Sequence, residues 1–91
     1  MAERKNYQVI ISAPAKRNLK KLPSSLQKRL EAKIVALSIN PRPAGVKALK
    51  SSDNLLRLRV GEYRVVYKVE DKRLIVIVIQ VGHRREVYRK L

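Results

Sequence analysis

The stretch LRLRVGEYRVVYKV, residues 56–69, is the part of the chain whose pattern determines the fold. Apolar residues alternate with arginine and other residues on both sides of Gly61-Glu62, which is the period of half-buried strands. A glycine in the first place of a two-residue turn is typical of a type II′ hairpin. The sequence therefore predicts a β-hairpin in which Arg59 lies opposite Arg64.

This register separates the side chains of the hairpin onto two faces, because successive strand residues point in opposite directions. One face is predicted to be open and to carry Arg57, Arg59 and Arg64. The other is predicted to be apolar and covered by helices, and it holds Leu56, Leu58, Val60, Tyr63, Val65 and Tyr67. A slip of one residue would bury arginine among leucine and valine, so the register is well determined.

A short strand and a helix are expected at the start of the chain. Residues 7–11, YQVII, are typical of a strand. Ser12 is a predicted N-cap and Pro14 stands near the first turn, so a helix should run to about Lys21. That helix should bury Ala15 and Leu19.

A second helix is expected after Pro23. The run SSLQ, residues 24–27, resembles a capping box. Four apolar residues follow at spacings of four, four and three, which predicts one buried helical stripe: Leu26, Leu30, Ile34 and Leu37. Asn40-Pro41 should end this helix. Because about three residues join the two helices, they should form a hairpin.

Beyond the helices we expect a loop over residues 40–54, then the β-hairpin, then a central strand at LIVIVI, residues 74–79, which is apolar on both faces. The predicted order is β-α-α-β-β-β. This is an α+β fold in which an N-terminal helical hairpin packs on one face of a small, mainly antiparallel sheet. A short basic C-terminal segment follows, and residues 1–91 form a single domain.

Charge is the strongest signal in the composition. The chain has 22 lysines and arginines against seven acidic residues, a formal net charge of +15. Such an excess usually serves to bind a polyanion. With one histidine and no cysteine, neither a disulfide nor a structural zinc site is expected, and the composition fits a reducing cytoplasm. We expect no cofactor, no metal, no signal peptide and no membrane span.

Two groups of cationic residues could carry chemistry. Arg59 and Arg64 face one another and repel, so either their heads splay into water or an anion sits between them. The ending VGHRREVYRKL, residues 81–91, should leave the sheet at Gly82. There Arg84 and Tyr88 could form an anion clamp with a ring for base stacking, or the segment could be a solubilising tail.

The sequence lacks the catalytic motifs of other enzyme classes. The sequence has no GxSxG, no phosphate-binding glycine loop and no HExxH. The acidic residues are scattered, which argues against a two-metal nuclease. If RNA is cleaved, its own 2′-OH should attack the phosphate while arginines stabilise the added charge. Proton transfer would then fall to Tyr88, His83 or an arginine.

Three segments carry a family resemblance: YQVIISAPAKRNLKKLP, LRLRVGEYRVVYKV and VIVIQVGHRREVY. Together they resemble the RelE/ParE-type toxins of bacterial toxin–antitoxin pairs, and GEYRVVY with VGHRREVY resembles the RelE branch. The resemblance implies a toxin that enters the ribosomal A site, cuts the mRNA there and is silenced by an antitoxin. The ParE branch shares the fold but inhibits DNA gyrase.

The resemblance also implies roles for five residues. Arg64 matches an arginine that contacts the scissile phosphate, and Arg84 one that acts as general acid. Tyr88 matches a tyrosine that stacks on a base and helps to activate the 2′-OH. Arg57 and Arg59 stand where some members carry lysine. Because arginine stays protonated, these two positions favour electrostatic stabilisation over general-base catalysis.

Further RNA contacts and partners complete the expectation. Lys50 matches a basic residue that contacts RNA, and the other expected contacts are Lys47, Lys68, His83 and Arg85. The partners should be an acidic antitoxin, the ribosome and mRNA, with no membrane. Two alternatives stay open: a gyrase inhibitor without catalysis, and a plain basic RNA-binding protein.

Overall fold

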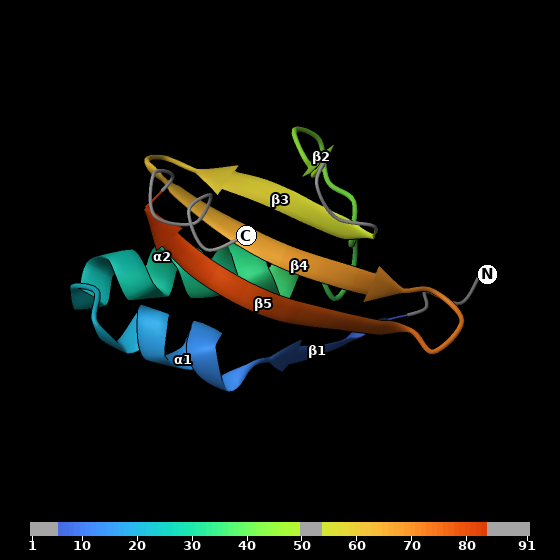
Figure 1. Ribbon diagram of the computed structural model, residues 1–91, viewed down its shortest axis with the longest axis horizontal. Helices are drawn as coiled ribbons and strands as arrows, with labels where there is room; N and C mark the ends of the chain where they lie inside the picture. Colours follow the sequence, from blue (N-terminus) through green and yellow to red (C-terminus); the bar gives the residue numbers. More distant parts are fainter. Residues whose placement is uncertain (1–5, 50–53, 84–91) are drawn as a thin grey trace.

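A five-stranded sheet forms one layer of the molecule (Figure 1). The computed structural model describes residues 6–49 and 54–83. Within them the strands are β1 (Gln8–Ile11), β2 (Lys47–Ala48), β3 (Leu55–Val60), β4 (Tyr63–Glu70) and β5 (Ile75–His83), in the spatial order β1-β5-β4-β3-β2. Only the β1–β5 pair is parallel. The α+β prediction, with its mainly antiparallel sheet and central last strand, is confirmed.

The predicted β-hairpin is confirmed in register as well as in position. Val60 pairs with Tyr63 and Arg59 with Arg64 across the turn. Gly61 has φ +60°, a left-handed value that glycine adopts without strain, as a type II′ turn requires.

The strand β2 was not predicted. Its two residues lie inside the expected loop 40–54 and pair with the edge of β3, Lys47 opposite Arg57 and Ala48 opposite Leu56. Two residues are too few to show a strand period in the sequence, so only the pairing partner reveals the strand.

The first helix, α1 (Ala13–Lys20), forms as predicted and buries Ala15 and Leu19. Ser12 is its N-cap: the hydroxyl accepts a hydrogen bond from the backbone N–H of Ala15 at 3.3 Å. The same hydroxyl donates to the carbonyl of Ile79 at 2.9 Å. The cap therefore also ties the start of α1 to β5.

The second helix, α2 (Ser24–Ala36), buries the predicted stripe at Leu30 and Ile34, and Leu37 just after the helix is buried too. The predicted capping box is wrong, because the N-cap is Pro23 and no side chain caps the helix. Gln27 instead donates to the carbonyl of Leu22 at 2.8 Å. A glutamine can bond any nearby carbonyl, and here the turn between the helices is within reach.

Both helices cover the same face of the sheet (Figure 1) and form the core with it. The largest fully buried side chains are Tyr67, Leu30, Ile34, Leu37, Val65, Val66, Val76, Val78 and Val81. The apolar face of the hairpin therefore faces the helices, as predicted. Within the described residues, no helix is long and apolar enough to cross a bilayer.

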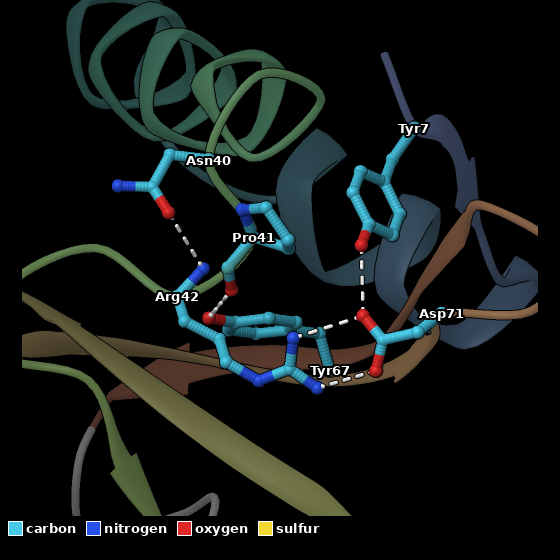
Figure 2. A network of polar contacts seen from close by, with 6 residues as sticks. All are labelled: Tyr7, Asn40, Pro41, Arg42, Tyr67 and Asp71. Carbon is cyan, nitrogen blue, oxygen red and sulfur yellow. Dashed lines mark hydrogen bonds and ion pairs between the residues drawn. The ribbon is translucent and has the colours of Figure 1, made fainter. Parts of the chain in front are cut away.

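A polar cluster fastens the loop after α2 to the sheet (Figure 2). The buried Tyr67 hydroxyl donates to the carbonyl of Pro41 at 2.6 Å. Arg42 donates to both carboxylate oxygens of Asp71, at 3.0 and 2.9 Å, and the Tyr7 hydroxyl donates to the same carboxylate at 2.7 Å. We call Tyr7, Arg42, Tyr67 and Asp71 the loop clip.

Two residues of the loop clip have strongly shifted pKa values. The hydrogen bond from Arg42, followed by the one from Tyr7, lowers the pKa of Asp71 to about 2. Burial raises the pKa of Tyr67 to about 12. At neutral pH the carboxylate is therefore fully charged and the buried phenol fully protonated, which is the state that this set of hydrogen bonds requires.

Candidate functional site

A basic hollow of about 200 Å³ opens on the sheet face opposite the helices. Among the described residues it is lined by Gly45, Lys47, Arg57, Arg59 and Arg64, so four of these five are cationic and none carries a carboxylate. Facing arginines repel, and phosphate or carboxylate oxygens bound between them would relieve that repulsion. We call this cavity the basic hollow.

The sheet register explains why these side chains meet. Residues that pair across antiparallel strands share a face, so Arg59 lies beside Arg64 and Lys47 beside Arg57. The unpredicted strand β2 thus brings Lys47 to the site. Gly45, in the turn before β2, has φ +89°, a conformation that other residues rarely adopt.

The arginine face is less open than predicted. Only 8% of Arg64 is exposed and Val66, on the same face, is fully buried, whereas Arg59 is exposed. The Arg64 guanidinium is thereby held in place, while Arg59 stands at the mouth of the hollow. A buried arginine has few rotamers and loses less freedom when it binds a ligand.

A bulge in β5 makes room for Arg64. Val66 pairs with Gln80 but the next residue, Tyr67, pairs with Val78, so Ile79 is the extra residue. As a result Arg64 lies opposite Gly82. Without the bulge its neighbour would be Val81, whose side chain would stand on the arginine face.

Gly82 lies within β5 and does not mark the point where the chain leaves the sheet, as the sequence had suggested. It contributes by having no side chain next to Arg64. A glycine shortly after the apolar run of residues 74–79 was the available signal, but its meaning depends on the bulge, which the sequence pattern did not reveal.

His83 lies on the other face of the sheet, away from the arginines. It pairs with Tyr63, and the two rings meet edge to face with centroids 5.7 Å apart. Together with Asn18 and Lys21 they line a separate hollow of about 250 Å³. Lys68 shares the arginine face but lies four residues along β4 from Arg64 and does not line the basic hollow.

The structure therefore brings together Arg57, Arg59, Arg64 and Lys47. Four other predicted site residues, Lys50, Arg84, Arg85 and Tyr88, lie outside the described residues. In the part of the chain that is described, no group of three or more His, Cys, Asp or Glu is placed to hold a metal ion. The donors around the basic hollow are cations, which bind anions and not metals.

Comparisons with known proteins agree on one family. Residues 9–88 match the model described as ParE toxin of type II toxin–antitoxin system, parDE. The chain is 38% identical over 72 residues to the mRNA interferase toxin RelE of Escherichia coli, covering 76% of each protein. It is 31% identical to the toxin RelG of Mycobacterium tuberculosis, covering 92% of this chain and 98% of RelG.

Solved structures show the same likeness. A chain in the toxin–antitoxin complex RelBE2 from Mycobacterium tuberculosis superposes with a TM-score of 0.78 at 26% identity, covering 92% of this chain and 98% of that one. A mutant of the Escherichia coli toxin RelE in the free state superposes with a TM-score of 0.76 at 28% identity, covering 92% of both chains.

Proposed function

Because the chain belongs to the ParE toxin family and is a RelE-type toxin of a type II toxin–antitoxin system, we propose that it is a metal-independent endoribonuclease. Its substrate is mRNA bound in the ribosomal A site. The observation that carries this proposal is the basic hollow, where three arginines and a lysine converge on one cavity.

The reaction needs little from the protein beyond positive charge and two proton transfers. The 2′-oxygen attacks the adjacent phosphorus and loses its proton, the bond from phosphorus to the 5′-oxygen breaks, and the leaving oxygen takes up a proton. The products are a 2′,3′-cyclic phosphate and a 5′-hydroxyl. In the transition state the phosphate carries added negative charge, which preorganised donors stabilise.

The residues of the basic hollow fit this electrostatic role. Arg64 is buried and held, so its donors are placed before the substrate arrives. Arg57 and Arg59 stay charged at any physiological pH and therefore hold the phosphate backbone and do not act as bases. Lys47 adds a fourth cation from β2. Lys68, further along the same face, would contact a neighbouring phosphate.

The proton transfers are assigned to residues of the C-terminal segment. We assign the general acid to Arg84, and base stacking with activation of the 2′-OH to Tyr88, on the strength of the family resemblance. Lys50 and Arg85 are assigned as RNA contacts on the same basis. His83 points to the helix-covered face, so its proposed RNA contact is separate from the basic hollow.

The proposed setting follows from the substrate. The toxin works in the cytoplasm, with the ribosome presenting mRNA in a cleavable conformation. A cognate acidic antitoxin neutralises it. Structures of relatives in complex with antitoxins, such as RelBE2, support a partner of this kind.

The test is cleavage of an mRNA programmed in the A site of purified ribosomes, comparing wild type with Arg64→Ala and Arg84→Ala. We expect ribosome-dependent cutting that falls at least about a hundredfold in either variant, the usual loss for a transition-state donor. Where sulfur replaces a non-bridging oxygen of the scissile phosphate, Mn²⁺ or Cd²⁺ should not restore cleavage, because no metal contacts that oxygen. Rescue, or full activity of Arg64→Ala, would refute the mechanism.

A second candidate function is inhibition of DNA gyrase, because the matching family model is the one described for ParE toxins. In that case the basic surface would bind protein or DNA without chemistry. Supercoiling by purified gyrase separates the two candidates: inhibition by wild type together with intact mRNA in the ribosome assay would favour this function.

A further inference from the structure

The outer edge of β5 is held by polar groups of α1 and its N-cap beyond the point where β1 ends. The strand β1 ends at Ile11, which pairs with Val78, whereas β5 continues to His83. The chain then turns into α1, which lies beside the rest of β5 (Figure 1). The backbone N–H of Ser12 donates to the carbonyl of Val78 at 2.9 Å, and the Ser12 hydroxyl donates to the carbonyl of Ile79 at 2.9 Å. These two bonds extend the pairing of β1 along β5.

Asn18, further along α1, makes the next contact with β5. Its side chain is partly buried. Oriented towards its acceptors, the amide nitrogen donates to the carbonyl of Val81 at 2.8 Å and to the carbonyl of Pro14, within α1, at 3.1 Å. A side-chain amide has two such donors, and here one bonds to the strand and the other to the helix. The Asn18 amide therefore joins α1 to the end of β5.

The contacts of Ser12 and Asn18 lie at the bulge of β5. Ile79, the extra residue of the bulge, accepts from Ser12, and Val81 accepts from Asn18. Val78 and Val81 are both fully buried in the core that the helices cover. A regular strand would place residues three apart on opposite faces, so the bulge shifts the alternation of β5 between these two valines. The two bonds from α1 and its N-cap hold the strand at this shift.

The register that Asn18 holds reaches the basic hollow one residue later. Backbone groups of successive strand residues point to opposite sides, so a Val81 carbonyl that faces α1 leaves the backbone of Gly82 facing β4. There Gly82 pairs with Arg64. If the bulge closed, the side chain of Val81 would take the place of Gly82 beside Arg64. Because only 8% of Arg64 is exposed, its guanidinium has little room to give way and would be displaced.

We propose that Asn18 is a positioning residue for RNA cleavage: its bond to the Val81 carbonyl holds the bulged register that seats Arg64 for the scissile phosphate. The proposal rests on the proposed function, which supplies the phosphate. Asn18 does not line the basic hollow. It therefore acts through Arg64 and not on the reacting atoms, and its loss should slow the chemical step more than it weakens binding.

The experiment compares Asn18→Ala with Gln27→Ala in cleavage of mRNA programmed in the A site of purified ribosomes. Gln27 is also a partly buried amide that bonds to a carbonyl at 2.8 Å, that of Leu22, but this contact lies at the turn between the helices. Alanine favours the helix at both positions, so both variants should fold. We expect the maximal cleavage rate to fall at least about tenfold in Asn18→Ala, with little change in the half-saturating ribosome concentration, and to stay within about twofold of wild type in Gln27→Ala.

A double-mutant cycle shows whether Asn18 acts through Arg64. In an Arg64→Ala background, Asn18→Ala should cost less than about twofold in rate, because no guanidinium is left to position. The same tenfold loss in that background would overturn the proposal, by making Asn18 a direct contact to RNA or a general support of the fold. Equal activities of Asn18→Ala and Gln27→Ala would also overturn it. If Asn18→Ala does not fold, Asn18→Asp keeps the shape of the side chain, cannot donate when ionised and allows the same comparison.

Binding of inorganic phosphate, measured by isothermal titration calorimetry, separates this proposal from the proposed function. If the wild type cuts no mRNA but Asn18→Ala binds phosphate more weakly than Gln27→Ala does, Asn18 positions Arg64 and the nuclease proposal falls. If the wild type cuts mRNA and both variants cut and bind phosphate as it does, the nuclease stands and the positioning role falls. No cutting together with equal phosphate binding in both variants would overturn both proposals.

Discussion

The loop clip and the basic hollow use charge in opposite ways. In the loop clip, Arg42 and Tyr7 meet the carboxylate of Asp71, so the charges balance inside the molecule. In the basic hollow, four of the five described lining residues are cations and none of the five is acidic. A cluster of like charges costs stability, so a fold retains one where a ligand of opposite charge completes it.

The two regions are linked through one loop. The loop clip fixes residues 41 and 42, and the same loop then supplies Gly45 and Lys47 to the basic hollow. We therefore expect the balanced region to act on stability and the unbalanced one on function. Variants in the two regions should separate these effects.

The largest expected effect comes from the hollow. Arg64→Gln keeps a polar side chain but removes the charge, so cleavage of ribosome-bound mRNA should fall at least about a hundredfold. Arg73→Gln, an exposed arginine paired with Glu70 in the β4–β5 turn, is the matched control and should retain activity. If both variants lost the same small factor, total charge and not the hollow would determine the activity.

The next effect concerns the clip. Tyr67→Phe removes the hydrogen bond to the Pro41 carbonyl and leaves that acceptor without its donor. The free energy of unfolding, measured with urea, should fall by about 1–3 kcal/mol. Tyr63→Phe is the control and should change it less, because Tyr63 is only partly buried. An unchanged midpoint in Tyr67→Phe would show that the bond does not hold the loop.

A smaller effect should come from adding an anion. Phosphate that binds the folded hollow should raise the free energy of unfolding by about 1.4 kcal/mol at ten times its dissociation constant. The increase should shrink in Arg59→Gln and persist in Asp71→Asn. Differential scanning calorimetry at constant ionic strength measures it, and an equal increase in all three proteins would point to general salt effects.

The smallest effect is the acid dependence of the clip. The pKa of Asp71 drops from 3.8 to about 2 on folding, so its ionised form stabilises the fold above pH 3.8. That contribution should be lost as the pH falls towards 2. Asp71→Asn should flatten this part of the stability curve. Since the ion pair between Arg42 and Asp71 is half exposed, added salt should screen it. The free energy of unfolding should then depend less steeply on pH.

The sequence predicts well wherever a pattern repeats. The hairpin register and the helical stripe follow from periods of 2 and 3.6, and the central strand from an unbroken apolar run; the hairpin register places Arg57, Arg59 and Arg64 on one face. The pairing of β2, the bulge at Ile79 and the loop clip depend on single residues meeting between separate segments of the chain. No local pattern encodes such contacts, so Lys47 was expected to bind RNA but not from a strand.

The strand order also has a consequence for the timing of folding. The strand β1 is synthesised first, yet its only neighbour in the described sheet is β5, and Ser12 bonds to Ile79 across 67 positions. At roughly 5–20 residues per second, synthesis of that interval takes about 3–13 s. During this time the apolar segment at Val9 and Ile11 lacks its partner strand. We therefore expect a slow, late closing step, within which chaperones or a binding partner have access to the nascent chain.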